Sequence, residues 1–316
     1  MPPVTSPPNL LAASPIVALD DATGRRSGTG GTLGYTPAVP AEQIARNLAF
    51  INWTVLVGLA LGSFAAVALT RFRTEATRGF LAFTSSCAVV FGILAYLSDG
   101  ALPATLGGSP TVADPAFDVP RRLALLAFCV FAALFTVALV RGRWARQLAV
   151  LTFVAAAGVL LFGALAWGGG LFGAIPLLLQ LGILATVTGG VFAAMILGHW
   201  YLVTPKLPTG PLILVARALL TAVGLQIVLF TVWVATGAGP AGSAPFAALT
   251  GPWALFVWLR LIVGLVFPLI VSWAAVKTAR TRSMESATGL LYINVGSIAA
   301  GTILAAGLYF GAGILV

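Results

Sequence analysis

The sequence predicts an all-α fold, a polytopic transmembrane helix bundle of about eight spans. Three observations predict it: 59% of the 316 residues are hydrophobic, only 8% are charged, and long apolar runs follow one another along most of the chain. Soluble domains carry about 25% charged residues. A soluble fold could not cover this much apolar surface, whereas lipid can, and a transmembrane helix needs about 20 apolar residues in a row.

The first element in chain order is a tail. Residues 1–46 are rich in Pro, Gly, Ser and Thr and show no sustained periodicity, which is typical of a disordered segment. Its apolar stretch 9–19 is short, is interrupted by Pro15 and follows no basic region, so we do not predict a signal peptide. The bundle is therefore expected over residues 47–316.

Eight apolar runs of membrane-spanning length follow the tail. The expected spans are 48–70, 79–98, 122–140, 147–167, 174–201, 211–235, 253–276 and 287–314. Only Gly168, Gly169 and Gly170 separate the fourth span from the fifth. One fused helix of about 50 apolar residues would be too long to cross a bilayer once, so we expect a turn there.

Basic residues predict the orientation of the bundle. The connections after the odd-numbered spans contain Arg71, Arg73, Arg78, Arg141, Arg143, Arg146, Lys206, Lys277, Arg280 and Arg282. The opposite side has Arg46, Arg121, Arg122, Asp99, Asp114 and Asp118. The positive-inside rule places the odd connections in the cytoplasm and both termini outside. The net charge of +9 therefore reflects topology and not nucleic-acid binding, and the 15:2 ratio of Arg to Lys indicates a GC-rich bacterium and hence its inner membrane.

The lengths of the connections suggest an internal repeat. The basic turns are short, the outer connections after spans 2 and 6 are long, and the outer connection after span 4 is very short. The order short, long, short thus occurs twice. Two parallel four-helix halves, residues 47–167 and 168–316, would produce this order, although the halves share no convincing residue-level identity.

Arg260 is the most prominent polar residue within a span, where ionisable groups are costly and often functional. It lies seven residues past Trp253, about 10 Å into its helix. Gly264 and Pro268 follow at a spacing of four, so all three lie near one face, and Pro268 is expected to kink the helix. Arg260 could contact an anion, a quinone or a carboxylate. Alternatively, it could reach outer headgroups or pair with Asp99.

Other candidates lie in the second half of the chain. His199, the only histidine, ends span 5 beside Trp200, where it could cap the helix or act as a hydrogen-bond donor, proton relay or axial haem ligand. Tyr292 lies two turns after Glu285 on the same face of span 8. The first half offers little beyond Asn52 and Trp53. The candidate ligand-binding or proton-relay residues are Arg260, His199, Glu285, Arg217, Tyr292, Gln180 and Gln226.

Missing motifs exclude several classes of protein. A single histidine excludes a bis-histidine haem or a multi-histidine metal site within this chain. The sequence has no GxxxxGKS phosphate loop, no HExxH motif and no CxxC pair. No carboxylate lies deep within a span, which disfavours a proton-coupled transporter. We therefore predict no catalytic residue, no metal ligand and no cofactor bound by the chain alone.

Eight helices, outer termini and a 4+4 arrangement resemble the NrfD-type membrane anchors of polysulfide and DMSO reductases. The spacing of Arg260, Gly264 and Pro268 is loosely similar to a late helix of that family, whereas the family's early motifs have no match here. The resemblance implies a quinone-linked membrane subunit that partners an iron–sulfur subunit and binds no haem. In it, Arg260, His199 or Glu285 would contact quinol or relay protons.

Two other functions remain open from the sequence. Gly and Pro in spans 5–7 would suit the broken helices of a small-solute transporter, with a cavity lined by Gln180, Gln226 and Arg260. The chain could also be a structural or assembly subunit without a site of its own. A non-catalytic or quinone-binding subunit is favoured over a stand-alone enzyme.

Overall fold

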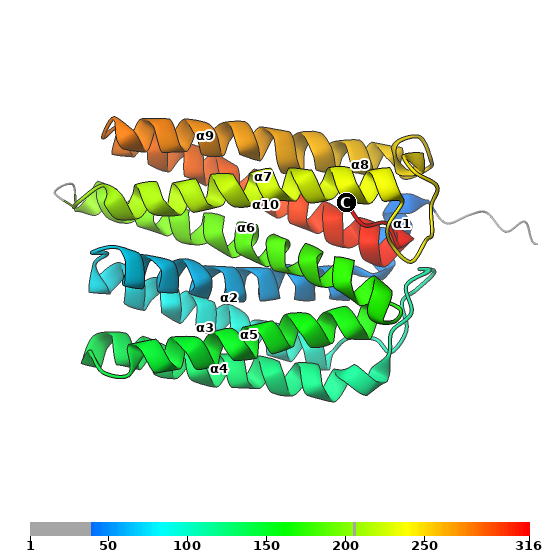
Figure 1. The fold of residues 1–316 in the computed structure, drawn as a ribbon, viewed down its shortest axis with the longest axis horizontal. Helices are drawn as coiled ribbons and strands as arrows, with labels where there is room; N and C mark the ends of the chain where they lie inside the picture. Colours follow the sequence, from blue (N-terminus) through cyan, green and yellow to red (C-terminus); the bar gives the residue numbers. More distant parts are fainter. Residues whose placement is uncertain (1–38, 205–206) are drawn as a thin grey trace, which may run out of the picture. The chain divides into compact units, whose positions relative to one another are not determined.

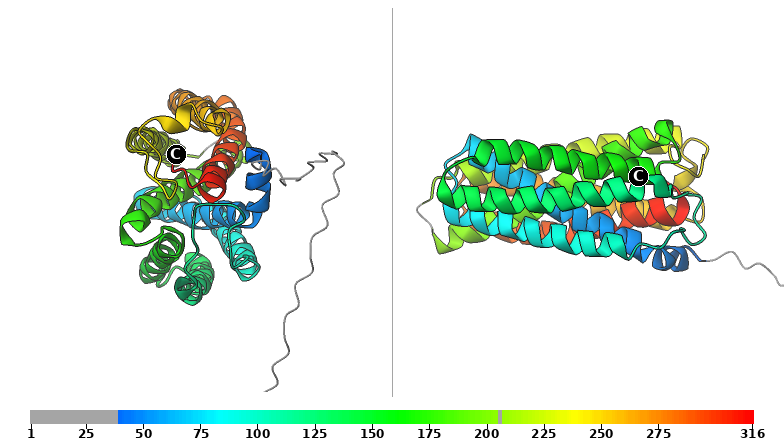
Figure 2. Two further views of the ribbon diagram at one scale, coloured as in Figure 1. Left: turned by 90° about the vertical axis from the view of Figure 1, so that its right-hand side faces the viewer. Right: turned by 90° about the horizontal axis from the view of Figure 1, so that it is seen from below.

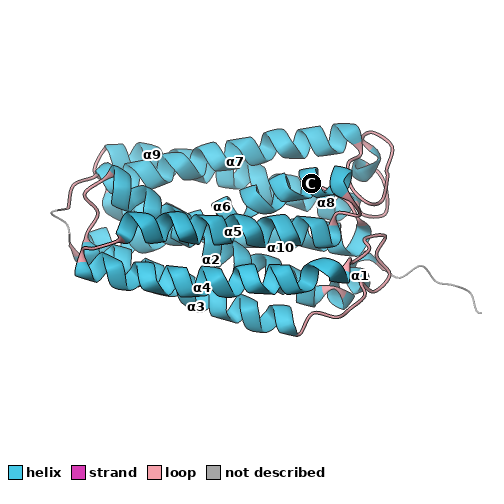
Figure 3. Cartoon of the chain, turned by 60° about the horizontal axis from the view of Figure 1, so that its bottom comes forward, coloured by secondary structure: helices cyan, strands magenta, loops and turns pink. Residues whose placement is uncertain are grey.

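The computed structural model describes residues 39–204 and 207–316. These residues form helices and no strand, which confirms the predicted all-α fold (Figure 3). Eight of the helical segments are long and apolar enough to cross a membrane, so the chain is an integral, multi-pass membrane protein. Most of the predicted tail lies outside the described residues, and its last part forms α1 (Pro40–Arg46).

The spans agree with the predicted ranges to within a few residues at most ends. They are α2 (Leu48–Arg73), α3 (Arg78–Gly100), η1 (Pro115–Phe117) with α4 (Asp118–Arg141), α5 (Ala145–Trp167), α6 (Leu171–Val203), α7 (Gly210–Thr236), α8 (Ala254–Leu261) with η3 (Ile262–Val266) and α9 (Phe267–Arg280), and α10 (Met284–Ala312). A short 3-10 turn, η2 (Ala247–Leu249), precedes α8. The expected turn between the fourth and fifth spans is present, with Gly169 and Gly170 at positive φ.

The helices lie side by side, with their connections at the two ends of the bundle (Figure 1). Seen end-on, α3, α4 and α5 gather on one side of α2 and α6, and α7, α8, α9 and α10 gather on the other (Figure 2). Consecutive spans pack against each other within each group, and α2 packs against α6 where the groups meet. The grouping follows the two halves of the chain; an internal repeat between them remains a prediction.

The seam between α2 and α6 leaves no room for a side chain at two positions, Gly62 and Gly189. A Cβ on Gly62 would lie 1.9 Å from the carbonyl oxygen of Ala185, and a Cβ on Gly189 would lie 2.2 Å from the amide nitrogen of Ser63. The Ser63 hydroxyl also donates to the carbonyl of Gly189 across the seam. Small residues at a spacing of four allow such close approach in membranes, so the two groups of helices are locked together here.

The predicted kink near Pro268 is a π-helical turn. The amide of Phe267 donates to Ile262, five residues back, and Pro268 has no amide hydrogen to offer. Two carbonyls are thereby left free, and side chains occupy both. The hydroxyl of Ser297 on α10 donates to Val263, and Nη1 of Arg260 donates to the carbonyl of Gly264 at 3.2 Å.

Candidate functional site

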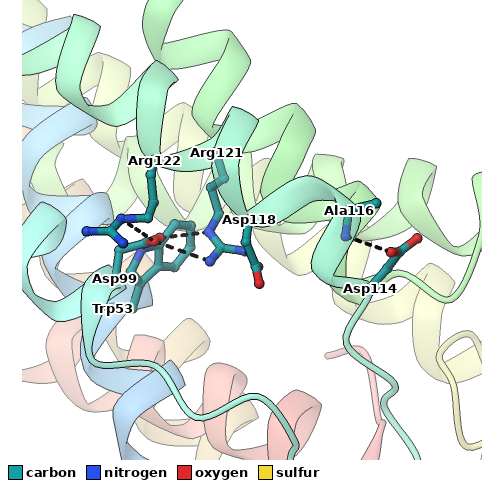
Figure 4. Close-up of polar contacts among 7 residues, drawn as sticks. All are labelled: Trp53, Asp99, Asp114, Ala116, Asp118, Arg121 and Arg122. Carbon is teal, nitrogen blue, oxygen red and sulfur yellow. Dashed lines mark hydrogen bonds and ion pairs between the residues drawn. The ribbon is translucent and has the colours of Figure 1, made fainter.

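A buried carboxylate lies at the end of α3 that we predict to face outward. Asp99 Oδ2 accepts hydrogen bonds from Trp53 Nε1 at 2.8 Å and from Arg121 Nε at 2.7 Å (Figure 4). Its other oxygen, Oδ1, accepts from Arg121 Nη2 at 3.3 Å and lies 3.7 Å from Nε of the partly exposed Arg122. Three helices, α2, α3 and α4, therefore meet at one carboxylate.

Arg121 is buried together with its partner. Its side chain is 3% exposed, and Nη1 donates to Oδ1 of the half-exposed Asp118 at 2.9 Å. The guanidinium carbon lies 4.7 Å from the ring centroid of Trp167, which adds a cation–π contact. Burying a charge is costly unless it is paired and hydrogen-bonded, and Arg121 meets both conditions.

Local sequence explains why these groups lie at helix ends. Asp99 is in the last turn of α3, where the negative end of the helix dipole disfavours a carboxylate. The cation of Arg121 offsets that cost. On the other side, Asp114 caps η1 by accepting from the amide of Ala116 at 3.0 Å, and Asp118 adds a favourable negative charge to the first turn of α4.

Aromatic rings from both halves of the chain pack beneath the ion pair. Trp53 and Trp167 meet edge-to-face with centroids 4.8 Å apart, and Phe50 stacks on Phe310 at 5.3 Å. The hydroxyl of Tyr309 donates to the carbonyl of Trp167 at 2.7 Å. The second half thus contributes α10 to a cluster whose charged residues all belong to the first half.

A hollow of about 270 Å³ opens beside the pair. Its polar lining is Asp99, Asp118, Arg121 and Arg122, and its apolar lining includes Phe50 and Trp167. The remaining lining comes mainly from the connection between α3 and η1. The hollow therefore places Arg122 and Asp118, whose side chains are partly exposed, within reach of one small ligand, with the buried ion pair and aromatic rings behind them.

The structure brings some of the candidate residues at the basic end together. Tyr292 Oη lies 3.3 Å from Nδ1 of His199, which joins α10 to α6. Glu285 and Tyr201 line a hollow of about 590 Å³ at the same end. Arg217 is exposed on α7. Lys206, one of the basic residues of the odd-numbered connections, lies outside the described residues. The roles suggested for these residues remain predictions.

The candidates deeper in the spans are buried. Arg260 is 1% exposed, so it does not reach headgroups, and Asp99 is paired with Arg121 instead. Within residues 39–204 and 207–316, Nε and Nη2 of Arg260 have no hydrogen-bond partner. Gln180 donates to the backbone oxygen of Val316 at 2.6 Å and accepts from Trp233 Nε1 at 3.2 Å. Gln226 is buried on α7.

From the sequence we placed Asp99 and Arg121 at helix ends but did not predict that they form an ion pair. The sequence does indicate this pair, because both residues lie at the same end of consecutive spans. Two helix ends on one side of a bilayer are neighbours when their helices pack, and a carboxylate and a guanidinium there can meet. Trp53, noted as one of the few polar groups of the first half, supplies the third contact.

The described residues hold no group of three His, Cys, Asp or Glu side chains that could bind a metal ion. Comparison with family models, curated proteins and solved structures found no match to this chain. The resemblance to NrfD-type membrane anchors therefore remains a prediction.

Proposed function

We propose that this integral membrane protein is a subunit of a quinone-linked electron-transfer complex, and that a quinol headgroup binds beside Asp99 and Arg121. One observation carries the proposal. A buried carboxylate, held by Trp53 and Arg121, faces a hollow with an aromatic wall at one end of the bundle. Such a site suits a flat ring that carries hydroxyl groups.

The size of the hollow is consistent with a headgroup and not with a large ligand. Pockets for drug-sized molecules span about 300–1,000 Å³, and this hollow holds about 270 Å³. One or two fused rings need less space than a drug-sized molecule. Leu102, Pro103 and Ala113 supply apolar lining for such rings, with Phe50 and Trp167, each 1% exposed, behind them.

The two carboxylate oxygens of Asp99 differ in the lengths of the contacts that they already accept. Oδ2 takes two short hydrogen bonds, at 2.7 and 2.8 Å, whereas the contacts of Oδ1 are 3.3 and 3.7 Å long. Oδ1 is therefore the less occupied oxygen. Because the Asp99 side chain is 0% exposed, a quinol hydroxyl would reach Oδ1 once the Arg122 guanidinium, 3.7 Å away, moves aside. Arg122, partly exposed at the rim, is placed to donate to the opposite oxygen of the ring.

Quinol oxidation releases two electrons and two protons. The electrons would pass to a partner subunit that carries an iron–sulfur cluster or haem. The protons would leave toward the aqueous end of the bundle, where Asp118 lies half-exposed on the wall of the hollow. Asp99, Arg121 and Asp118 would thus hold the headgroup and stabilise charge as it oxidises.

A transporter has less support from the packing. Alternating access needs the two groups of helices to rock against each other. The α2–α6 seam opposes such movement because Gly62 and Gly189 leave no room for even one added carbon. Sliding along this seam would drive backbone into backbone.

The proposal is tested by titrating the purified protein in nanodiscs with a short-chain quinol analogue, using calorimetry. We expect D99N to weaken binding at least tenfold and R122Q to weaken it several-fold. D114N is the control, since Asp114 caps η1 and does not line this hollow. R122Q keeps the buried pair, so it separates loss of binding from loss of folding. Equal affinities in wild type, D99N and R122Q would overturn the proposal.

A further inference from the structure

Another hollow lies at the basic end of the bundle, opposite the Asp99–Arg121 pair, between α4 and α5. It holds about 700 Å³, and its lining changes from basic to apolar along its length. At the turn it is lined by Arg141, Arg143 and Gln147. A groove that is basic at one end and apolar along the rest is complementary to an amphipathic molecule with an anionic headgroup and a hydrocarbon chain.

The apolar part of the groove is formed by two exposed helix faces. Leu134 and Val137 contribute from α4, and Leu148 and Leu151 contribute from α5. Leu134, Val137 and Leu151 are more than two-fifths exposed, as expected of side chains that face hydrocarbon. An acyl chain lying between the helices would cover these faces.

The basic part has no neighbouring acid in the sequence. Arg141, Arg143 and Arg146 lie within six residues of one another, and residues 119–284 contain neither Asp nor Glu. This turn is on the side that positive-inside bias places in the cytoplasm. The cytoplasmic leaflet is rich in anionic headgroups, and basic pockets between helices bind them.

The turn holds Trp144 in a conformation that bulky residues rarely adopt. Its φ is +66°, two residues after Gly142 at +74°, and the residue is 67% exposed and lines the groove. A left-handed tryptophan is strained, and such strain often marks a functional site. Tryptophan also favours the headgroup level of a bilayer, so the strained backbone places an interfacial ring next to two arginines.

We propose that this groove binds an anionic phospholipid of the cytoplasmic leaflet. Arg141 and Arg143 contact the headgroup phosphate, Trp144 packs on the glycerol region, and an acyl chain follows the α4–α5 groove. The proposal is independent of the quinol site, which lies at the other end of the bundle.

Native mass spectrometry tests it on the full-length protein, exchanged into detergent with equal phosphatidylglycerol and phosphatidylcholine. We expect wild type to retain at least one phosphatidylglycerol, and R141Q/R143Q to lose most of that adduct, about fivefold or more. The matched control is R71Q/R73Q, which removes two arginines from the last turn of α2 at the same membrane side. The control should retain the adduct.

The variant W144G distinguishes a role of the indole ring in lipid binding from a role in stabilising the fold. Glycine accepts a positive φ without strain, so the variant should melt at an equal or higher temperature in detergent while retaining less phosphatidylglycerol. Four results would overturn the proposal: equal retention of the two lipids, equal loss in the two double variants, competition of the adduct by inorganic phosphate alone, or a dimer of the chain that R141Q/R143Q abolishes.

Discussion

Arg121 Nε lies 2.7 Å from Oδ2 of Asp99, and both side chains are withdrawn from solvent. Among the ion pairs of residues 39–204 and 207–316, this is the one in which neither partner is appreciably exposed. This ion pair joins the end of α3 to the start of α4, which are separated by a connection of about 17 residues. The strength of this ion pair should determine how this end of the first half responds to mutation.

D99N should destabilise the fold severely. The substitution leaves Arg121 buried without its main counter-charge, and breaking one side of a buried pair costs about 3–5 kcal/mol. Thermal melting in detergent, followed by size-exclusion chromatography, measures the loss. The double variant D99L/R121M removes both charges and should recover most of the stability. A D99N protein that melts with wild type would show that the pair contributes little.

G189A should prevent stable folding, whereas G182A on the same helix should not. The added carbon at Gly189 would meet the backbone of Gly62 and Ser63 at 2.2–2.5 Å, and backbone cannot move aside. Gly182 has no such neighbour within 4 Å, so alanine there should gain up to about 1 kcal/mol from helix propensity. Expression level and melting temperature distinguish the two. Similar behaviour of both variants would contradict the described seam.

R260M should leave stability unchanged or raise it. Two nitrogens of this buried guanidinium have no partner among the described residues, and replacing an uncompensated buried charge with an apolar chain of similar length relieves its desolvation cost. The lost hydrogen bond to Gly264 reduces the gain. S297A, by contrast, only frees the carbonyl of Val263 and should cost about 1–3 kcal/mol. A strong loss in R260M would point to a counter-ion beyond the described residues.

Orientation is tested by fusions at the C-terminus. Ten basic residues in the odd connections predict that the end of α10 faces outward. Alkaline phosphatase fused after Val316 should therefore be active in bacterial cells, and green fluorescent protein at the same position should be dark. The same reporters fused after Arg143 should behave in the opposite way. Reversed signals would place the basic turns outside.

The eight spans were predictable because each is a long apolar run with at most one charged residue, and lipid requires little else of a helix. A close helix contact was predictable from the small residues spaced four apart, Gly58 and Gly62 on one helix and Ala185 and Gly189 on the other. Spacing does not say which helix a residue faces. For example, the environment of Arg260 depends on Gly301, which is 41 residues later in the sequence. Gly301 lies against Gly264 where α10 crosses the π-helical turn.

The polar cluster was harder to predict for a similar reason. Asp99 and Arg121 are 22 residues apart, and the connection between them has no periodic pattern to follow. Because α3 and α4 run in opposite directions, Asp99 and Arg121 lie at the same end of the bundle. The alternation does not determine how each helix is rotated about its own axis. For α4, the packing of Phe128 and Phe135 against Phe64 of α2 shows which face turns inward, and the sequence alone does not reveal these contacts.

The hydrogen bond from Tyr309 to Trp167 joins residues that are 142 positions apart. Ribosomes add about 5–20 residues per second, so roughly 7–28 s separate the synthesis of the two. During that interval the Asp99–Arg121 pair can already form within the first four spans, while Phe50 and Trp167 still lack Phe310 beside them. The first half must therefore persist in the membrane as an incomplete assembly, and its charged end is finished only when the last helix is inserted.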